Sequence, residues 1–438
     1  MALVSWRSFP AAAVRAAAAV AAVTIAMARA VLPHAAAAAP TPDPPRTAMF
    51  IFAVQLSCTA ACFDEVVADY AAAGCTGARL FLSLNMFAAA CPVPNYGGDT
   101  RAAAGGRGSV RTSRRRAPPA VEAWAPDEVV RVSAPAPVPS PAGEAVASPP
   151  AGAVDSWGLD RINQAALPLD GNTSTSGCYP AAGAGVHVFV LDSGINDKHA
   201  QFAHLGDRLT ATVAPGAPFP NGTDELGHGT HVIGTIAGVD TGVAPGVNVT
   251  SIKTQGGAED GSLIDLVAGI DAVTGWAAAS PTTPVLLSLS LGLARPPFGP
   301  DMLATAVNRA AASGLLTITS AGNGGGDACG ATPGWAAAAI NVAASNRTDG
   351  LAPSSNRGPC VDVVAPGSNI VSADARSATA LVGRTGTSMA APHVTGVAAL
   401  VLGEAGGRVT RGGLLDAMTD ATAVVAGFPL AWASPGRC

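Results

Sequence analysis

Charged and aromatic side chains are scarce in this sequence, and it has no apolar run of membrane length. Only 13% of the 438 residues are Asp, Glu, Lys or Arg, 5% are aromatic, and the formal net charge is -5. Proteins that bind nucleic acids need a basic surface, so we expect no nucleic-acid partner. The longest apolar run, Ala16 to Ala28, falls short of the roughly 20 residues that span a bilayer. We therefore expect a monomer with no stable membrane span.

Residues 1–40 have the pattern of a targeting segment. Arg7 precedes the apolar run, small residues from Ala28 to Ala39 offer cleavage sites, and no acidic residue is present. We interpret the segment as a secretory signal peptide, which directs the protein out of the cell or to a vacuole-type compartment. A transit peptide to an organelle is the alternative. The eight cysteines favour an oxidising compartment.

Residues 46–132 have the pattern of a small α+β domain. Its periodicity predicts strands at 49–54, 78–83 and 128–132 and a helix at 61–74. The Gly- and Arg-rich insert 97–119 is a surface loop, a processing site at Arg114 to Arg116, or a misjoined exon. Residues 133–153 are rich in Pro, Ala and Ser, which predicts a linker.

Residues 154–438 have the pattern of a larger α/β domain. Short β-branched runs alternate with helical stretches. The expected strands are 186–191, 247–253, 285–290 and 315–320, and the expected helices are 229–237, 262–276 and 301–312. Such alternation predicts a doubly wound, mostly parallel sheet with helices on both faces. Function in such sheets lies at the carboxyl ends of the strands.

Three short motifs place an acid, a base and a nucleophile at that edge. Asp192 ends a predicted strand, and His228 and Ser388 each stand at the start of a predicted helix. A serine hydroxyl becomes a useful nucleophile when an imidazole takes its proton and a carboxylate orients that imidazole. The order Asp, His, Ser is the order found in subtilisin, and no Gly-x-Ser-x-Gly elbow is present.

Four motifs together resemble the subtilisin-like serine peptidases of the proteinase K group. They are Val-Leu-Asp-Ser-Gly, Gly-His-Gly-Thr-His, Ser-Ala-Gly-Asn and Gly-Thr-Ser-Met-Ala-Ala-Pro-His, in this order between about residues 154 and 419. The resemblance implies a serine endopeptidase with Asp192 as orienting acid, His228 as general base and Ser388 as nucleophile. It also implies that the side-chain amide of Asn323 binds the oxyanion. An esterase or acyltransferase with the same three side chains is a rival reading.

The resemblance also suggests where a peptide or protein substrate binds. Ser290, Leu291 and Gly292 match the segment that pairs with the substrate main chain and lines the specificity pocket, together with Ala321 and Gly322. None of the five side chains is charged. A broad specificity with an apolar or aromatic residue before the scissile bond is therefore expected. The alternative is that 288–292 is a buried strand with no substrate contact.

No cofactor is expected for the chemistry, and calcium is expected only as a structural ion. Asp362 matches a calcium-binding aspartate of the group, with main-chain carbonyls near Ala337 and Ala339 as further ligands; the alternative is a plain Asp at the start of a strand. His231 and His393 are expected to be structural, because no zinc-ligand spacing is present. The resemblance implies a Cys329–Cys360 disulfide, and the pairing of the other six cysteines stays open.

The segments 83–90 and 121–132 resemble the inhibitory propeptide of these peptidases. This implies a precursor whose own propeptide is an intramolecular inhibitor, released by self-cleavage within 133–153. The rival is a binding protein on a protease fold that keeps its propeptide in the cleft. Residues 424–438 do not resemble the family's usual C-terminal end.

Overall fold

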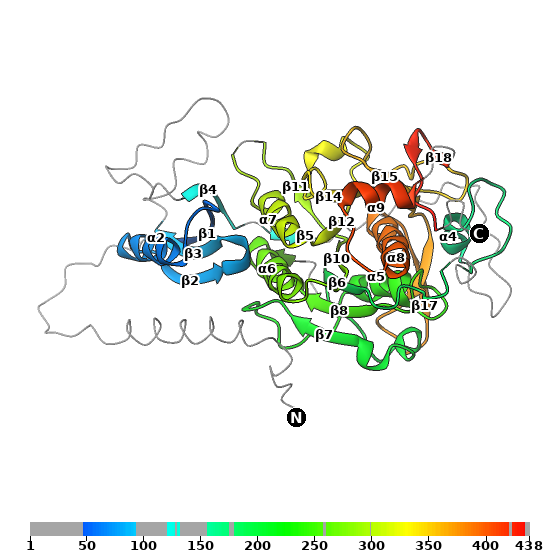
Figure 1. Cartoon of the computed structure of the whole chain (residues 1–438), viewed down its shortest axis with the longest axis horizontal. Helices are drawn as coiled ribbons and strands as arrows, with labels where there is room; N and C mark the ends of the chain where they lie inside the picture. Colours follow the sequence, from blue (N-terminus) through cyan, green and yellow to red (C-terminus); the bar gives the residue numbers. More distant parts are fainter. Residues whose placement is uncertain are drawn as a thin grey trace, which may run out of the picture.

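The computed structural model describes a small N-terminal unit docked against a larger α/β unit (Figure 1). The described residues are 47–92, 121–127, 129–131, 156–174, 179–256, 260–297, 299–419 and 423–433. The predictions for residues 1–40, the insert 97–119, the linker 133–153, Cys178 and Cys438 lie outside them. Across the described residues, no helix combines the length and apolar character needed to cross a membrane.

The larger unit is built on a seven-stranded sheet in which every neighbouring pair is parallel. Its spatial order is β15-β14-β12-β10-β6-β8-β7. The strands are β6 His187–Asp192, β7 Leu209–Val213, β8 Asn248–Lys253, β10 Val285–Leu289, β12 Leu316–Ser320, β14 Ala339–Ser345 and β15 Val363–Pro366. The doubly wound parallel sheet is therefore confirmed. Its first strand, β6, lies between β8 and β10, and the crevice at such a switch point is where ligands bind.

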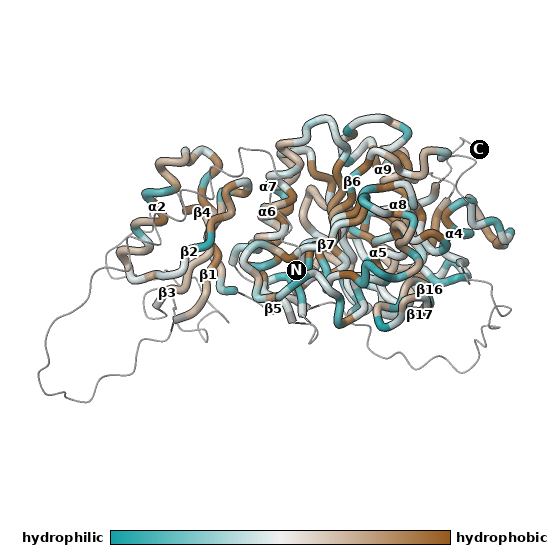
Figure 2. The backbone as a smooth tube through the Cα atoms, turned by 90° about the horizontal axis from the view of Figure 1, so that it is seen from below, coloured by the Kyte–Doolittle hydropathy of each residue, from teal (hydrophilic) through white to brown (hydrophobic). Residues whose placement is uncertain are grey.

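Two pairs of helices cover the two faces of this sheet. Helices α5 (His228–Ala237) and α8 (Thr387–Ala405) lie on one face, and α6 (Leu263–Ala279) and α7 (Met302–Ala310) on the other. Side chains alternate along a strand, so β6 sends Val188 and Val190 into the α5/α8 core and Phe189 and Leu191 into the α6/α7 core. The hydrophobic colouring of α8 and of the sheet strands marks these layers in Figure 2.

The N-terminal unit is a four-stranded antiparallel sheet, in the order β2-β3-β1-β4, with one helix. Its elements are β1 Thr47–Val54, α2 Ala60–Ala72, β2 Thr76–Phe81, β3 Met86–Pro92 and β4 Val121–Pro126. One face of the sheet packs on α2 through Phe52 and Phe87. The other face, with Ile51 and Met86, joins the core under α6 and α7. Disulfides link Cys58 to Cys62 and Cys75 to Cys91.

Shorter elements complete the described structure. They are β5 Val129–Arg131, α4 Trp157–Ile162, β9 Asp260–Ser262, β11 Leu293–Ala294, β13 Ala331–Thr332, β16 Ile370–Ala373, β17 Leu381–Arg384, α9 Arg411–Met418, β18 Val424–Val425 and β19 Phe428–Pro429. The expected Cys329–Cys360 disulfide is present. Residues near the C-terminal end pack on β15, where the main-chain N–H of Ala431 donates to the carbonyl of Val364 at 2.9 Å.

Candidate active site

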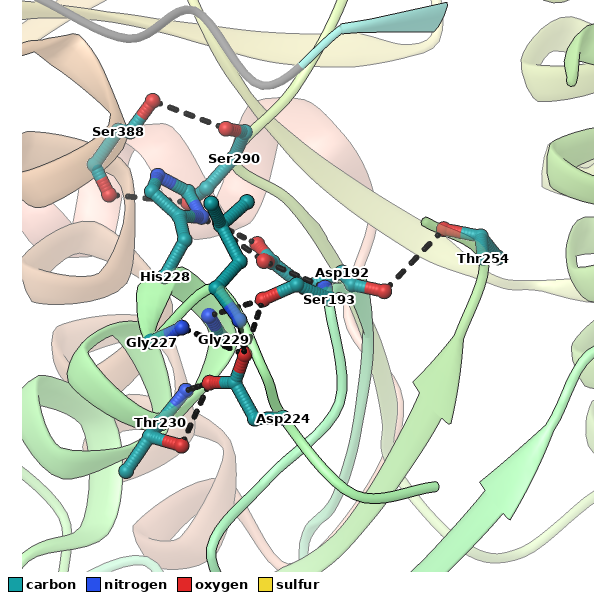
Figure 3. Close-up of polar contacts among 11 residues, drawn as sticks. Asp192, Ser193, Asp224, Gly227, His228, Gly229, Thr230, Thr254, Ser290 and Ser388 are labelled. Carbon is teal, nitrogen blue, oxygen red and sulfur yellow. Dashed lines mark hydrogen bonds and ion pairs between the residues drawn. The ribbon is translucent and has the colours of Figure 1, made fainter. Parts of the chain in front are cut away.

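Asp192 and His228 meet at the carboxyl edge of the sheet. Asp192 is the last residue of β6 and His228 the first of α5, and both side chains are buried. Nδ1 of the imidazole lies 2.8 Å from Oδ1 and 2.9 Å from Oδ2 of the carboxylate. This contact assigns the ring proton to Nδ1. The second ring nitrogen, Nε2, is buried and has no hydrogen-bond partner among the described residues. The imidazole is thus oriented by an acid and presents an acceptor nitrogen (Figure 3).

Asp224 fixes the start of α5 and with it the place of His228. Its Oδ1 accepts from the N–H of Gly227 at 2.7 Å, and its Oδ2 from the N–H of Thr230 at 2.9 Å. The hydroxyl of Ser193, next to Asp192, also donates to Oδ1 at 2.8 Å. A carboxylate at a helix N-terminus is favoured by the helix dipole. The sequence reasoning missed Asp224; its only signal was an acid three residues before a glycine that precedes a helix.

Two glycines let α5 approach β6 closely. A Cβ on Gly229 would lie 2.3 Å from the carbonyl oxygen of Gly194 and 3.2 Å from the Cβ of Asp192. Gly194 itself has φ +107°, a backbone conformation that other residues rarely adopt. The distance between the imidazole and the carboxylate therefore depends on the absence of side chains at these positions.

Ser388 lies beside this pair, in the first turn of α8, with the ring of His228 between it and Asp192 (Figure 3). Its hydroxyl donates to the main-chain carbonyl of Ser290 at 2.9 Å. The three residues that the motifs singled out thus come together from three elements. In this structure the hydroxyl proton is directed at Ser290 and not at His228.

Pro392 explains why Ser290 is part of this arrangement. A proline has no N–H, so the carbonyl four residues earlier in the helix, that of Ser388, loses its usual donor. The hydroxyl of Ser290 donates to that carbonyl at 3.0 Å instead. Ser290 therefore contacts Ser388 twice, as donor and as acceptor, and fixes the first turn of α8 against the end of β10.

The side-chain amide of Asn323 is held at the same helix start. Its Oδ1 accepts from the N–H of Thr387 at 2.9 Å and from the hydroxyl of Thr387 at 3.0 Å. That hydroxyl in turn accepts from the N–H of Gly322 at 3.1 Å. Because Oδ1 is fixed by Thr387, the orientation of the amide is defined, and its donor group Nδ2 lies on the other side.

The expected substrate segment is packed rather than fully open. Leu291 and Ala321 are buried, and a Cβ on Gly292 would lie 2.5 Å from the carbonyl oxygen of Thr332. Gly322 has φ +95°. The sequence reasoning missed strand β9, which pairs antiparallel with β5 and has Gly261 opposite Val130. The only sequence feature that could have indicated β9 was Gly261, which directly precedes Ser262, the N-cap of α6.

The two further histidines are buried and neutral. Burial lowers the pKa of His231 to about 3 and that of His393 to about 4. Nε2 of His231 lies 2.9 Å from the carbonyl oxygen of Ile370, and Nδ1 of His393 lies 2.9 Å from that of Met389. Both rings thus donate to main-chain carbonyls, as structural histidines do.

Asp362 was expected to bind calcium, but its contacts do not fit that ion. One carboxylate oxygen is paired with Arg411 and the other accepts from the N–H of Asn341 at 2.8 Å. The carbonyl of Ala339, one of the two main-chain carbonyls expected as ligands, accepts from Arg411 at 2.7 Å.

A large part of this chain is similar to a known family and to known proteins. Residues 183–423 match the subtilase family. The chain is 42% identical over 246 residues to an extracellular serine proteinase of Thermus sp. (strain Rt41A), covering 56% of each protein. It is 37% identical over 253 residues to proteinase T of Parengyodontium album, covering 56% of this chain and 80% of that one.

A solved structure shows the same fold. The crystal structure of a cold-adapted subtilisin-like serine proteinase matches with a TM-score of 0.55 at 33% identity, covering 64% of this chain and 98% of that chain. The chain spans about half the length of relatives such as alkaline serine exoprotease A of Vibrio alginolyticus, of which it covers 43% at 40% identity. Because the matched region, 183–423, is more than half of the sequence, this chain belongs to the subtilase family.

Proposed function

We propose that this chain is a serine endopeptidase, made as a precursor that is inhibited by its own N-terminal unit. The observation that carries the proposal is the buried Asp192–His228 pair beside Ser388 at the carboxyl edge of the sheet. Asp192 holds the proton on Nδ1 of His228, so Nε2 is the basic nitrogen that faces the nucleophile. The names of similar proteins, serine proteinases among them, support the same reaction class.

In the acylation step, Oγ of Ser388 attacks the carbonyl carbon of the scissile peptide bond. Its proton moves to Nε2 of His228, and the imidazolium is stabilised by Asp192. The amide Nδ2 of Asn323 and the main-chain N–H of Ser388 donate to the resulting oxyanion. The C–N bond then breaks, and the proton on His228 passes to the leaving amine.

In the deacylation step, His228 takes a proton from water as the water oxygen attacks the ester carbon. The same two donors bind the second oxyanion. The bond to Oγ breaks, Ser388 regains its proton from His228, and the carboxylic acid product leaves. Besides the chain itself, the two steps need only the substrate and one water molecule.

The N-terminal unit is proposed to be the inhibitor because of how it contacts the larger α/β unit, which we call the peptidase unit from here on. Its strand β5 pairs through the main chain with β9, which is how an extended peptide substrate would bind. The carboxylate of Asp127 accepts from the hydroxyl of Ser262 at 3.0 Å and from the N–H of Ile264 at 3.1 Å, so it caps α6. In this proposal β5 takes the place of a substrate strand, and the contacts of Asp127 with α6 hold it there.

Arginines bind the rest of this interface from both sides. Arg79 of the N-terminal unit forms a 2.8 Å ion pair with Asp265 on α6. Arg309 on α7 donates to the carbonyls of Leu84, Asn85 and Val54 at 2.8–2.9 Å. The first contact joins α6 to β2, and the second joins α7 to the end of β1 and to the turn that follows β2. We propose that cleavage within 133–153 frees this unit.

The proposed substrates are peptides and proteins, cut with an apolar or aromatic residue before the scissile bond. The uncharged set Leu291, Gly292, Ala321 and Gly322 supports this preference. Secretion is proposed from the targeting pattern and from the extracellular relative in Thermus sp..

The test compares the wild-type chain with Ser388→Ala by intact mass and by labelling with a fluorophosphonate. We expect only the wild type to lose its N-terminal unit and to take the label. Ser313→Ala, at the opposite edge of the sheet, is the matched control and should be labelled like the wild type. If the wild-type chain folds but stays full length and unlabelled, the proposal that it is a serine endopeptidase is wrong.

That negative result would favour the binding protein that keeps its N-terminal unit in the cleft. The contacts of β5 with β9 are the observation that supports this second candidate. Hydrolysis of ester substrates without any hydrolysis of peptides would favour the esterase.

A further inference from the structure

Arg411 lies where the sequence analysis expects a calcium ion. It is the first residue of α9, and its side chain turns back towards the edge of the sheet. Nε donates to the carbonyl oxygen of Ala339 at 2.7 Å, and Nη2 pairs with Oδ1 of Asp362. These are a carbonyl and the carboxylate that were expected to bind the metal. One guanidinium therefore contacts two of the expected ligands, Asp362 and the carbonyl of Ala339.

Each oxygen of the Asp362 carboxylate has a partner. Its Oδ2 accepts from the N–H of Asn341 at 2.8 Å, and its own N–H donates to the carbonyl of Asn341 at 3.0 Å. Calcium takes about 6–8 oxygen ligands at roughly 2.3–2.6 Å. An ion at this place would have to displace the guanidinium, whose positive charge also repels it.

The position of Arg411 in the first turn of α9 also indicates that its role is the contact with Asp362 and Ala339. A cation in the first turn of a helix is disfavoured by the helix dipole, so Arg411 does not stabilise the end of α9. Thr410 caps that end instead, by accepting from the N–H of Gly413 at 3.1 Å. The side chains of Arg411 and Asp362 are only 31% and 26% exposed. The arginine thus links α9 to β14 and to the start of β15.

We infer that the guanidinium of Arg411 replaces a calcium ion at this corner of the fold. The pair with Asp362 and the bond to Ala339 supply the cross-link that an ion would give. The stability of this corner is then independent of calcium concentration. This inference does not depend on the proposed peptidase activity.

The test measures the melting temperature of the full chain in EDTA and in millimolar calcium. Ser388→Ala is used as the parent, so that self-digestion does not contribute. Arg411→Met should lower the melting temperature in EDTA by roughly 2–4 °C, and calcium should restore part of the loss. The double variant Arg411→Met with Asp362→Asn should show no such restoration. In the parent, Asp362→Asn should leave any calcium response unchanged, because no ion binds at Asp362.

Arg408→Met is the matched control. Arg408 lies three residues earlier and donates to main-chain carbonyls only, among them those of Ala277 at 2.6 Å and Ser280 at 3.1 Å. Its loss should lower the melting temperature without creating a calcium response, because no carboxylate is exposed. This separates the loss of an arginine from the opening of a cation site.

Two results would overturn the inference. In the first, the parent gains stability from calcium and Asp362→Asn abolishes the gain, which places an ion at Asp362 despite Arg411. In the second, Arg411→Met folds and calcium leaves its melting temperature unchanged. If Arg411→Met folds in calcium but not in EDTA, the inference is supported. If it folds in neither, Arg411→Gln, which retains hydrogen bonding without the charge, is measured in the same way.

Discussion

The two faces of the seven-stranded sheet hold their partners by different physical means. On the α5/α8 face, glycines let the packed segments approach each other closely. A Cβ on Gly229 would lie 2.3 Å from Gly194, and one on Gly396 would lie 2.4 Å from the Cβ of Val243. On the α6/α7 face, an apolar centre is rimmed by ionised groups such as Arg79 and Arg309. On the first face, neighbouring segments are held by close backbone packing. On the second, the N-terminal unit is held by charged side chains at the edge.

This difference sets how each face can open. Close backbone contacts are lost only by unfolding, because nothing can replace them without leaving a cavity. Charged groups at a rim are re-solvated by water, so separating them costs little. The first face suits side chains that must keep a fixed geometry. The second suits a domain that docks and later leaves.

The largest expected effect comes from the carboxylate behind the imidazole. Asp192→Asn should lower kcat/KM for a fluorogenic peptide by roughly 10⁴-fold, because an amide neither fixes the tautomer of His228 nor stabilises its charged form. Asp197→Asn, an exposed acid paired with Lys198, is the control and should retain full activity. A loss of less than tenfold for Asp192→Asn would contradict the assigned role.

The next largest effect tests the close approach on the α5/α8 face. Gly229→Ala should lower kcat by roughly 10²-fold, because the added Cβ separates α5 from Asp192 by a fraction of an ångström or more. Gly412→Ala, also in a helix but with open space around its Cβ, is the matched control. Circular dichroism confirms that both variants are folded. Equal rates for the two variants would show that this approach is not critical.

A smaller effect is expected at the rim of the α6/α7 face. Arg309→Met removes bonds to three carbonyls of the N-terminal unit, so docking should weaken by roughly tenfold or more. The lag before peptide hydrolysis appears in freshly refolded chain should shorten. Arg295→Met, which loses contacts with Trp335 and Cys329 inside the peptidase unit, should leave the lag unchanged. An unaltered lag for Arg309→Met would argue against docking through this rim.

The same docking should also depend on pH. Burial raises the pKa of Asp271, whose Oδ1 accepts from the N–H of Leu84, to about 7. When the N-terminal unit leaves, the carboxyl group is hydrated and its pKa returns towards 3.8. The docked state therefore binds the proton more tightly. Docking is strongest at low pH, weakens by roughly tenfold per unit at most as the pH rises from 3.8 towards about 7, and levels off above that value.

Gel filtration at pH 5 and pH 8 measures this dependence through the fraction of cleaved N-terminal unit that stays with the peptidase unit. Asp271→Asn remains uncharged at both values, so its retained fraction should change less. Asp265→Asn changes the charge at the rim without changing the buried carboxyl of Asp271, and the pH dependence should persist. If Asp271→Asn responds to pH like the wild type, another group is responsible.

The sheet and its helices could be predicted because their signals are local. The β-branched run 186–191 and the helical run 262–276 each carry enough apolar residues to define their element, and the structure has β6 and α6 there. Strand β3 was missed because Ala88, Ala89 and Ala90 have low strand propensity; pairing with β1 decides their conformation. Prediction from local sequence fails where contacts with a distant part of the chain determine the conformation.

The candidate site shows the same division. Asp192, His228, Asn323 and Ser388 stand in short motifs that can be read directly. Asp224 has no such motif, and its role is visible only through the N–H groups it accepts. Arg411 is 49 residues from Asp362 in sequence, so no spacing rule connects the two. Long-range polar partners are the part that the sequence alone does not specify.

The pairing of β5 with β9 has a consequence for how the molecule responds to dilution. As long as β5 belongs to the same chain as β9, its effective concentration at β9 is set by the connecting segment and not by the protein concentration. Dilution then does not separate β5 from β9. Once the chain is cut, the same contact becomes bimolecular, and its occupancy falls as the two pieces disperse. Cleavage of one peptide bond outside the interface thus makes the β5–β9 contact dependent on protein concentration, although the interface itself is unchanged.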